Sequence, residues 1–215
     1  MPKAGSDISG MVRLIRKSLG ETRATVQKEN PFQVLISTVL SQRTRDENTE
    51  KASGQLFRKY RNPRQLSQAS LKDIEKLIKP SGFYKTKARR VKEISRILVE
   101  RYKGKVPRDF DRLMSLPGVG RKTANCVLVY AYGIPAIPVD THVHRISNRI
   151  GLVKTKAPEK TESGLLKIVP RKNWIEFNDL FVKFGQRTCK PIKPECWRCP
   201  IVKQCGYPNK NLKPR

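Results

Sequence analysis

The sequence contains few acidic residues for its length. Its 215 residues include only 18 Asp and Glu, against 46 Lys and Arg, which gives a formal net charge of +28. An excess of this size repels itself and is best accommodated beside a polyanion such as a nucleic acid. A generally basic surface without such a partner is the alternative. The composition therefore favours nucleic-acid binding before any motif is considered.

Long apolar runs are also missing. No stretch approaches the ~20 apolar residues that a membrane-spanning helix needs, and the first residues, MPKAGSDISGMVRL, lack the apolar core of a signal peptide. We therefore expect no membrane segment and an intracellular, cytoplasmic protein. Disulfides are rare in that compartment, so the five cysteines need another explanation.

The alternating pattern of β-strands is absent, and helical periodicity dominates, so we predict an all-α fold. Residues 31–40 are apolar on nearly all sides, which is typical of a central buried helix. Residues 83–102 have one apolar face, which includes Val91, Ile94 and Leu98. We expect the opposite face to be solvated and able to meet phosphates; it carries Lys85, Lys87, Arg89, Arg90 and Lys92.

The stretch LPGVGRKTAN, residues 116–125, superficially resembles a phosphate-binding loop of nucleotide-binding proteins. A P-loop requires glycine directly before its Lys-Thr pair, but Arg121 stands there, and Thr123 replaces the third glycine of the dinucleotide fingerprint. Both motifs also need a strand upstream, whereas residues 108–117 predict a helix ending in a proline turn. A nucleotide-binding loop is therefore disfavoured.

A hairpin between two helices fits the same residues better. Gly118 and Gly120 permit positive φ and close approach by a ligand, and the helix that follows offers N–H groups to a phosphate. Val119 and Arg121 lie within the same turn. Contacts of this kind position a duplex without reading its sequence. An ordinary helix–helix turn is the alternative, which the charge of the chain disfavours.

Four cysteines near the C-terminus have the spacing C-x6-C-x2-C-x5-C and predict a metal site: Cys189, Cys196, Cys199 and Cys205. Both zinc and an iron–sulfur cluster accept four thiolates. Zinc ribbons usually pair two C-x2-C units, and only one is present here. Cys126 is separate from this group, and we expect it to be a small buried side chain.

Residues 116–152, LPGVGRKTANCVLVYAYGIPAIPVDTHVHRISNRIGL, closely resemble the helix-hairpin-helix and catalytic segment of the endonuclease III family of DNA base-excision glycosylases. The resemblance extends over residues 31–205. It implies that Lys122 is the nucleophile, that Asp140 is the catalytic aspartate and that His142 lines the cleft. It also implies a 4Fe–4S cluster on the four cysteines.

The resemblance further implies two helical lobes with DNA between them. One is a six-helix lobe of residues 25–134, and the other combines residues 1–24 with residues 135–215 and carries the cluster. Lys122 and Asp140 would face each other at the mouth of the cleft. Chemically, Lys122 could instead contact a phosphate, and Asp140 could be a plain N-cap, or both cap and catalyst.

Two short segments depart from the family pattern at the residues that enter the duplex. In LSQRTRD, residues 40–46, an ungapped match puts Arg43 where the family has a glutamine, and Gln42 comes one place earlier. Either could fill the gap left by a flipped base. Phe83 replaces the usual leucine of a second wedge loop, where it could stack between bases or instead pack into the core.

The function indicated is a bifunctional DNA glycosylase and AP lyase, active as a monomer on duplex DNA that carries oxidised pyrimidines or abasic sites. A non-catalytic helix-hairpin-helix module is one alternative, but both Lys122 and Asp140 are present. A monofunctional mismatch glycosylase is the other, and those relatives replace the hairpin lysine. His144, two residues beyond His142, points away from it on a helix, and we expect it at the surface or on a phosphate.

Overall fold

The computed structural model describes residues 7–20 and 29–214. Within those residues the chain forms helices and turns and no strand, so the all-α prediction is confirmed. No helix in the described part is both long and apolar enough to cross a membrane. Two compact units are present, one within Gln27–Gly133 and the other combining parts of Met1–Val26 with Ile134–Arg215.

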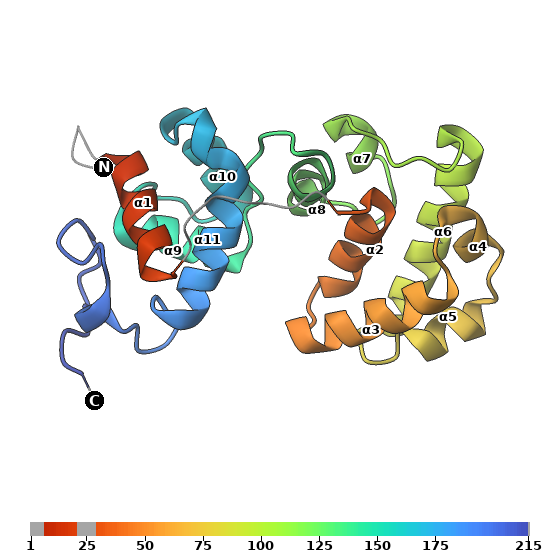
Figure 1. The fold of residues 1–215 in the computed structure, drawn as a ribbon, viewed down its shortest axis with the longest axis horizontal. Coiled ribbons are helices and arrows are strands. Elements are labelled where there is room, and N and C mark those ends of the chain that lie inside the picture. The colour runs from red at the N-terminus through yellow and green to blue at the C-terminus, as the bar shows by residue number, and fades with distance from the viewer. Residues whose placement is uncertain (1–6, 21–28, 215) are drawn as a thin grey trace. The chain divides into compact units, whose positions relative to one another are not determined.

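In the described part of the unit within Gln27–Gly133, helices joined by turns and loops are the regular structure (Figure 1). Its elements are α2 (Pro31–Ser41), α3 (Asp46–Lys59), α4 (Pro63–Gln68), α5 (Leu71–Leu77), α6 (Tyr84–Tyr102), α7 (Phe110–Met114), α8 (Arg121–Cys126) and the π-helix η1 (Val127–Ala131).

Helix α2 is the centre of this unit, as its all-round apolar sequence predicts. Asn30 caps it by accepting hydrogen bonds from the N–H groups of Phe32 and Gln33, and Pro31 occupies the first turn, where no intrahelical donor is needed. Leu35 and Ile36 are fully buried. Helices α3, α6 and α8 and the π-helix all pack against α2.

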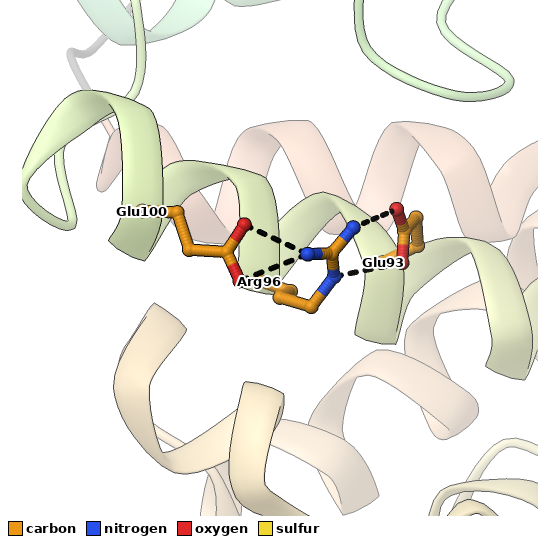
Figure 2. Close-up of polar contacts among 3 residues, drawn as sticks. All are labelled: Glu93, Arg96 and Glu100. Carbon is orange, nitrogen blue, oxygen red and sulfur yellow. Dashed lines mark hydrogen bonds and ion pairs between the residues drawn. The ribbon is translucent and has the colours of Figure 1, made fainter.

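Helix α6 is the longest helix of the structure and carries an ion-pair bridge on its exposed face. Figure 2 shows Arg96 between Glu93 and Glu100, with N–O distances of 2.7 and 2.8 Å. The partners lie three and four residues away, the spacing at which side chains of one helix meet. The bridge supports the helix locally, while Ala88 and Leu98 are buried on the opposite face.

The second unit holds α1 (Ile8–Ser18), α9 (Thr141–Ile150), α10 (Pro158–Ile168), the 3-10 helix η2 (Arg171–Asn173), α11 (Trp174–Arg187) and the 3-10 helix η3 (Cys196–Arg198). Figure 1 shows α1 beside α11, and the two helices are in contact. Arg16 of α1 forms a salt bridge with Glu176 of α11. Phe177, Phe181 and Phe184 of α11 supply the largest side chains of this core.

Candidate active site and cysteine cluster

The glycine hairpin joins α7 to α8, as the sequence indicates. Gly118 has φ +74°, a conformation that favours glycine, and a Cβ added there would lie 2.8 Å from Cδ of Arg90, whose side chain would have to shift. Gly118 and Gly120 are exposed, whereas the Val119 side chain is only 5% exposed. Val119 therefore anchors the hairpin, and the hairpin presents its backbone to a ligand.

Helix α8 begins at Arg121, with Gly120 as its N-cap. The Arg121 guanidinium lies over the Phe110 ring, 4.7 Å from the ring centroid. Lys122 is half-buried in the first turn, and no other residue in the described ranges forms a hydrogen bond or ion pair with it. The amine is thus close to the positive end of a helix and is not neutralised locally.

Asp140 is the N-cap of α9, as predicted. Its Oδ1 accepts a hydrogen bond from the backbone N–H of Val143 at 2.8 Å. The residue is half-buried, and the cap leaves Oδ2 outside the interaction. Asp140 can therefore serve as a cap and as a carboxylate at the same time. Lys122 and Asp140 belong to different units of the structure.

The two histidines of α9 have different surroundings. Nδ1 of His142 lies 3.2 Å from Nη2 of Arg145, which also donates to the Cys189 carbonyl oxygen at 2.9 Å. Nδ1 of His144 lies 2.7 Å from the Thr161 hydroxyl. His144 is thus half-buried in a hydrogen-bonded network within its own unit, and the expected surface or phosphate role is replaced by this contact.

The two proposed wedge residues lie together. Phe83 is 65% exposed, so it does not pack into the core as a helix-terminal staple would. Arg43 is exposed as well, and its guanidinium carbon lies 6.0 Å from the centroid of the Phe83 ring. Gln42, by contrast, is engaged elsewhere, because its amide Nε2 donates to the carbonyl oxygen of Gly118 at 2.9 Å.

Lys87 is placed differently from the sequence-based expectation. Helical periodicity predicts that Lys87 lies on the solvated basic face of α6, but it is 3% exposed. Its ammonium is surrounded by oxygen atoms of Leu40, Gln42, Thr44 and Ser81 at 2.6 to 2.9 Å. Burial first, and then repulsion from Arg90, lower the pKa of Lys87 to about 8. Helical periodicity could not reveal these partners, because they come from other segments.

The four C-terminal cysteines line one cavity, together with Arg149 and Tyr207. All are free thiols. The pKa of Cys199 is raised to about 11, mainly by burial and to a smaller extent by the other three cysteines, against an opposing hydrogen bond from the Ile201 backbone. Such thiols are poor nucleophiles by themselves and become thiolates when a metal centre stabilises that form. Cys126 is a separate, buried side chain on α8, as expected.

The donor set around this cavity fits a thiolate-bound metal cluster. Nη1 of Arg149 lies 3.8 Å from Sγ of Cys189, and the Tyr207 N–H donates to Sγ of Cys205 at 3.5 Å, contacts that suit negatively charged sulfur. Within residues 7–20 and 29–214, no group of three or more His, Cys, Asp and Glu side chains is arranged so that it could hold a metal ion.

Two arginines that the sequence did not single out hold the cysteine segment against α9. Arg149 donates to the carbonyl oxygens of Lys190 and Pro191, both at 2.6 Å, and Arg145 donates to that of Cys189. Gly185 of α11 makes room, since a Cβ there would lie 2.5 Å from Nδ1 of His142. The spacing of the two arginines, four residues apart on one helix face, was the available signal.

Comparisons with known proteins agree with this fold. Residues 36–171 match the family model described as HhH-GPD superfamily base excision DNA repair protein. The chain is 56% identical to endonuclease III of Thermotoga maritima over 84% of this chain and 85% of the relative, and 38% identical to that of Bacillus subtilis over 82% and 81%.

Solved structures give the same result. A trapped covalent intermediate of endonuclease III with DNA matches with a TM-score of 0.85 and 38% identity, covering 93% of this chain and 94% of that one. A thermostable thymine-DNA glycosylase matches at 0.81 with 28% identity, covering 93% and 95%. The chain belongs to the HhH-GPD superfamily of base excision DNA repair proteins and, within it, to the endonuclease III family.

This membership confirms the function that the sequence indicates, a base excision DNA glycosylase with AP lyase activity. A non-catalytic hairpin module and a monofunctional mismatch glycosylase are not favoured.

Proposed function

We propose that this chain removes oxidised pyrimidines from duplex DNA and nicks the resulting abasic strand by β-elimination. The observation that carries the proposal is Lys122, half-buried in the first turn of α8 and two residues after the second of two exposed glycines. A lysine placed beside a phosphate-binding hairpin can reach the adjacent sugar, where an amine nucleophile forms a Schiff base.

The glycine hairpin is the proposed grip on the DNA backbone. Gly118 and Gly120 let a phosphate approach closely, and the start of α8 contributes a positive dipole end. Arg121, held over Phe110, adds a charge at the same place. These contacts are independent of base sequence, which a repair enzyme requires because lesions arise in any sequence.

The chemistry then proceeds in two stages. The damaged nucleotide leaves the stack at a cost of a few kcal/mol, which is lowest for a damaged base. The neutral Lys122 amine attacks C1′, and the base departs with its bonding electrons. The attacking nitrogen then loses a proton, and the sugar ring opens as the C1′–O4′ bond breaks and O4′ takes up a proton, which leaves a Schiff base at C1′. Loss of a C2′ proton from this Schiff base expels the 3′ phosphate. Asp140 accepts a proton or stabilises the cationic sugar, and His142 lines the same cleft.

Arg43 and Phe83 are the proposed residues that enter the duplex. Both are exposed and lie against each other, whereas Gln42 already donates to Gly118. Arg43 fills the gap left by the flipped base and hydrogen-bonds to the orphaned partner, and Phe83 stacks between neighbouring bases. In this proposal Arg43 fills the gap, and Gln42 links the turn that carries Arg43 to the glycine hairpin.

The cysteines are the proposed ligands of a 4Fe–4S cluster. Cys189, Cys196, Cys199 and Cys205 line one cavity, and their spacing matches that of the endonuclease III family. The cluster would supply structural order rather than redox chemistry, shaping the basic segment of residues 190–199 toward DNA phosphates. Purified protein that is colourless and contains zinc would overturn this assignment.

The decisive experiment incubates the protein with duplexes containing thymine glycol, dihydrouracil, uracil or an abasic site. We expect strand nicking at thymine glycol, dihydrouracil and the abasic site, and none at uracil. Nicking at the abasic site alone would reduce the function to a lyase. We further propose that the enzyme acts as a monomer on nucleoid DNA in the cytoplasm, and sedimentation with and without duplex checks the monomer.

A further inference from the structure

Lys87 carries a buried charge whose acceptors are all neutral. Its Nζ lies 2.7 Å from the Leu40 carbonyl oxygen and 2.6 Å from that of Gln42; it is also 2.8 and 2.9 Å from the hydroxyls of Thr44 and Ser81. An ammonium has three protons, so four oxygens share them. Burying a cation without an anion is costly, and these oxygens offset the cost only while they stay in place.

The oxygens around Lys87 come from two separate turns. Leu40, Gln42 and Thr44 belong to the turn that ends α2, and Ser81 belongs to the loop before α6. Direct bonds reinforce the junction. The Ser81 hydroxyl donates to the Leu40 carbonyl oxygen at 2.9 Å, and the Gly82 N–H donates to the Thr44 hydroxyl at 3.1 Å. Lys87 therefore fastens one turn to the other.

Arg43 and Phe83 stand at the tips of these two turns in strained conformations. Their φ angles are +52° and +58°, in the left-handed region that residues other than glycine rarely adopt. Each such residue costs on the order of 1 kcal/mol and persists where the surrounding structure imposes it. The surrounding structure here is the set of oxygens bound to Lys87, which includes the carbonyl of Gln42, next to Arg43.

The same turns are tied to the glycine hairpin. The Gln42 amide donates to the carbonyl oxygen of Gly118, and the Arg90 side chain of α6 occupies the space that a Cβ on Gly118 would need. Lys87 and Arg90 lie one helical turn apart on α6. The position of the wedge residues and the position of the phosphate-binding hairpin are thus set by one connected group of contacts.

We propose that Lys87 is a positioning residue that holds Arg43 and Phe83 together as one rigid wedge, in register with the glycine hairpin, so that base flipping and gap filling occur as a single step. The inference rests on the proposed function, in which Arg43 and Phe83 enter the duplex. Lys87 does not touch the DNA and acts through these two side chains.

The test compares Lys87→Met with wild type on abasic sites in duplex and in single-stranded DNA. Flipping and gap filling are needed only in the duplex. We expect Lys87→Met to slow borohydride trapping about tenfold on the duplex, the effect of losing ~1.4 kcal/mol of preorganisation, and to leave trapping on the single strand unchanged. Arg96→Met is the matched control, because Arg96 lies on the same helix but pairs with Glu93 and Glu100 on its exposed face.

Coupling to the wedge distinguishes positioning from a general loss of structure. If Lys87 acts through the wedge, adding Lys87→Met to Arg43→Ala and Phe83→Ala causes no further loss on the duplex. Additive losses, or an equal loss on the single strand, would overturn the inference. Should Lys87→Met not fold, Thr44→Val removes one acceptor at a half-buried position and takes its place.

The outcomes also separate this inference from the proposed function. Failure of the proposed function appears as wild-type protein that forms no adduct with either DNA. Failure of the Lys87 inference appears as wild-type protein that is active and a Lys87→Met variant with unchanged duplex activity. Fluorescence of 2-aminopurine placed opposite an abasic analogue reports wedge insertion directly, and it should rise with wild type and Arg96→Met and stay low with Lys87→Met.

Discussion

Oδ1 of Asp140 accepts a hydrogen bond from the backbone N–H of Val143 at 2.8 Å, and Oδ2 lies outside that bond. One carboxylate therefore starts helix α9 and keeps an oxygen for chemistry. The two roles make different demands, since a cap needs only an oxygen acceptor, whereas proton transfer or charge stabilisation needs an anion.

Substitution of Asp140 separates these roles. We expect Asp140→Asn to retain the stability of the wild type, because asparagine also caps, and Asp140→Ala to lose about 1 kcal/mol of unfolding free energy. Both variants should lose base removal by at least about a hundredfold, the usual contribution of an acid–base group. Urea unfolding and single-turnover nicking measure the two effects. Full activity in Asp140→Asn would leave the residue as a cap alone.

Substitution of Lys122 distinguishes a nucleophile from a phosphate contact. We expect Lys122→Arg to keep duplex affinity, because arginine retains the positive charge, and to form no covalent adduct, because a guanidinium cannot form a Schiff base with C1′. Borohydride trapping on an abasic duplex and binding by fluorescence anisotropy measure the two properties. A covalent adduct in Lys122→Ala would show that another amine is the nucleophile.

Removal of one cysteine should release the metal. We expect Cys199→Ser to lose visible absorbance and bound iron, because three thiolates and a hydroxyl hold the cluster poorly. Cys126→Ser is the control, because Cys126 is buried on α8, away from the cavity that the other four line. Iron content by mass spectrometry checks both variants, and equal iron in the two would disprove the assigned ligands.

The salt dependence of DNA binding should show whether Arg121 contacts a phosphate. Each phosphate contact lowers the logarithm of affinity by about 0.9 per unit of the logarithm of salt concentration. Arg121→Ala should therefore reduce the slope by about 1 and weaken binding equally for all sequences. Anisotropy titrations from low to moderate salt measure the slope. An unchanged slope would mean that Arg121 makes no phosphate contact.

The stability of the protein should rise with pH through the titration of Lys87. Its pKa is lowered from 10.5 to about 8, first by burial and then by Arg90. Below pH 8 the folded and unfolded chains both keep this proton, so it contributes no pH dependence. Between about pH 8 and 10.5 only the unfolded chain keeps it, and the free energy of unfolding gains up to about 1.4 kcal/mol per pH unit.

Comparison with Lys87→Met isolates that titration from the other lysines. The unfolding free energy of wild type, measured relative to the variant in urea, should be flat below pH 8 and should increase above it. A constant difference across this range would mean that Lys87 titrates with the same pKa in both states and that its charge is not held in the interior.

The sequence by itself determined the features that depend on neighbours within a turn or two. Asp140 caps the helix that begins one residue later, the glycines precede α8, and the four cysteines fall at metal-ligand spacing in one segment. Hydrogen bonds and side-chain faces that repeat every three or four residues follow directly from the order of residues. The all-α fold follows from the same periodicity.

Only the tertiary structure decided where Lys87, Phe83 and His144 lie. Periodicity predicts a solvated position for Lys87. The side chain is buried instead, among oxygen acceptors that include the Leu40 carbonyl, 47 residues away. Phe83 is an apolar residue left exposed on a strained turn, and His144 finds Thr161 on another helix. Such contacts depend on how helices pack and on which polar groups need partners there, and no local pattern encodes either.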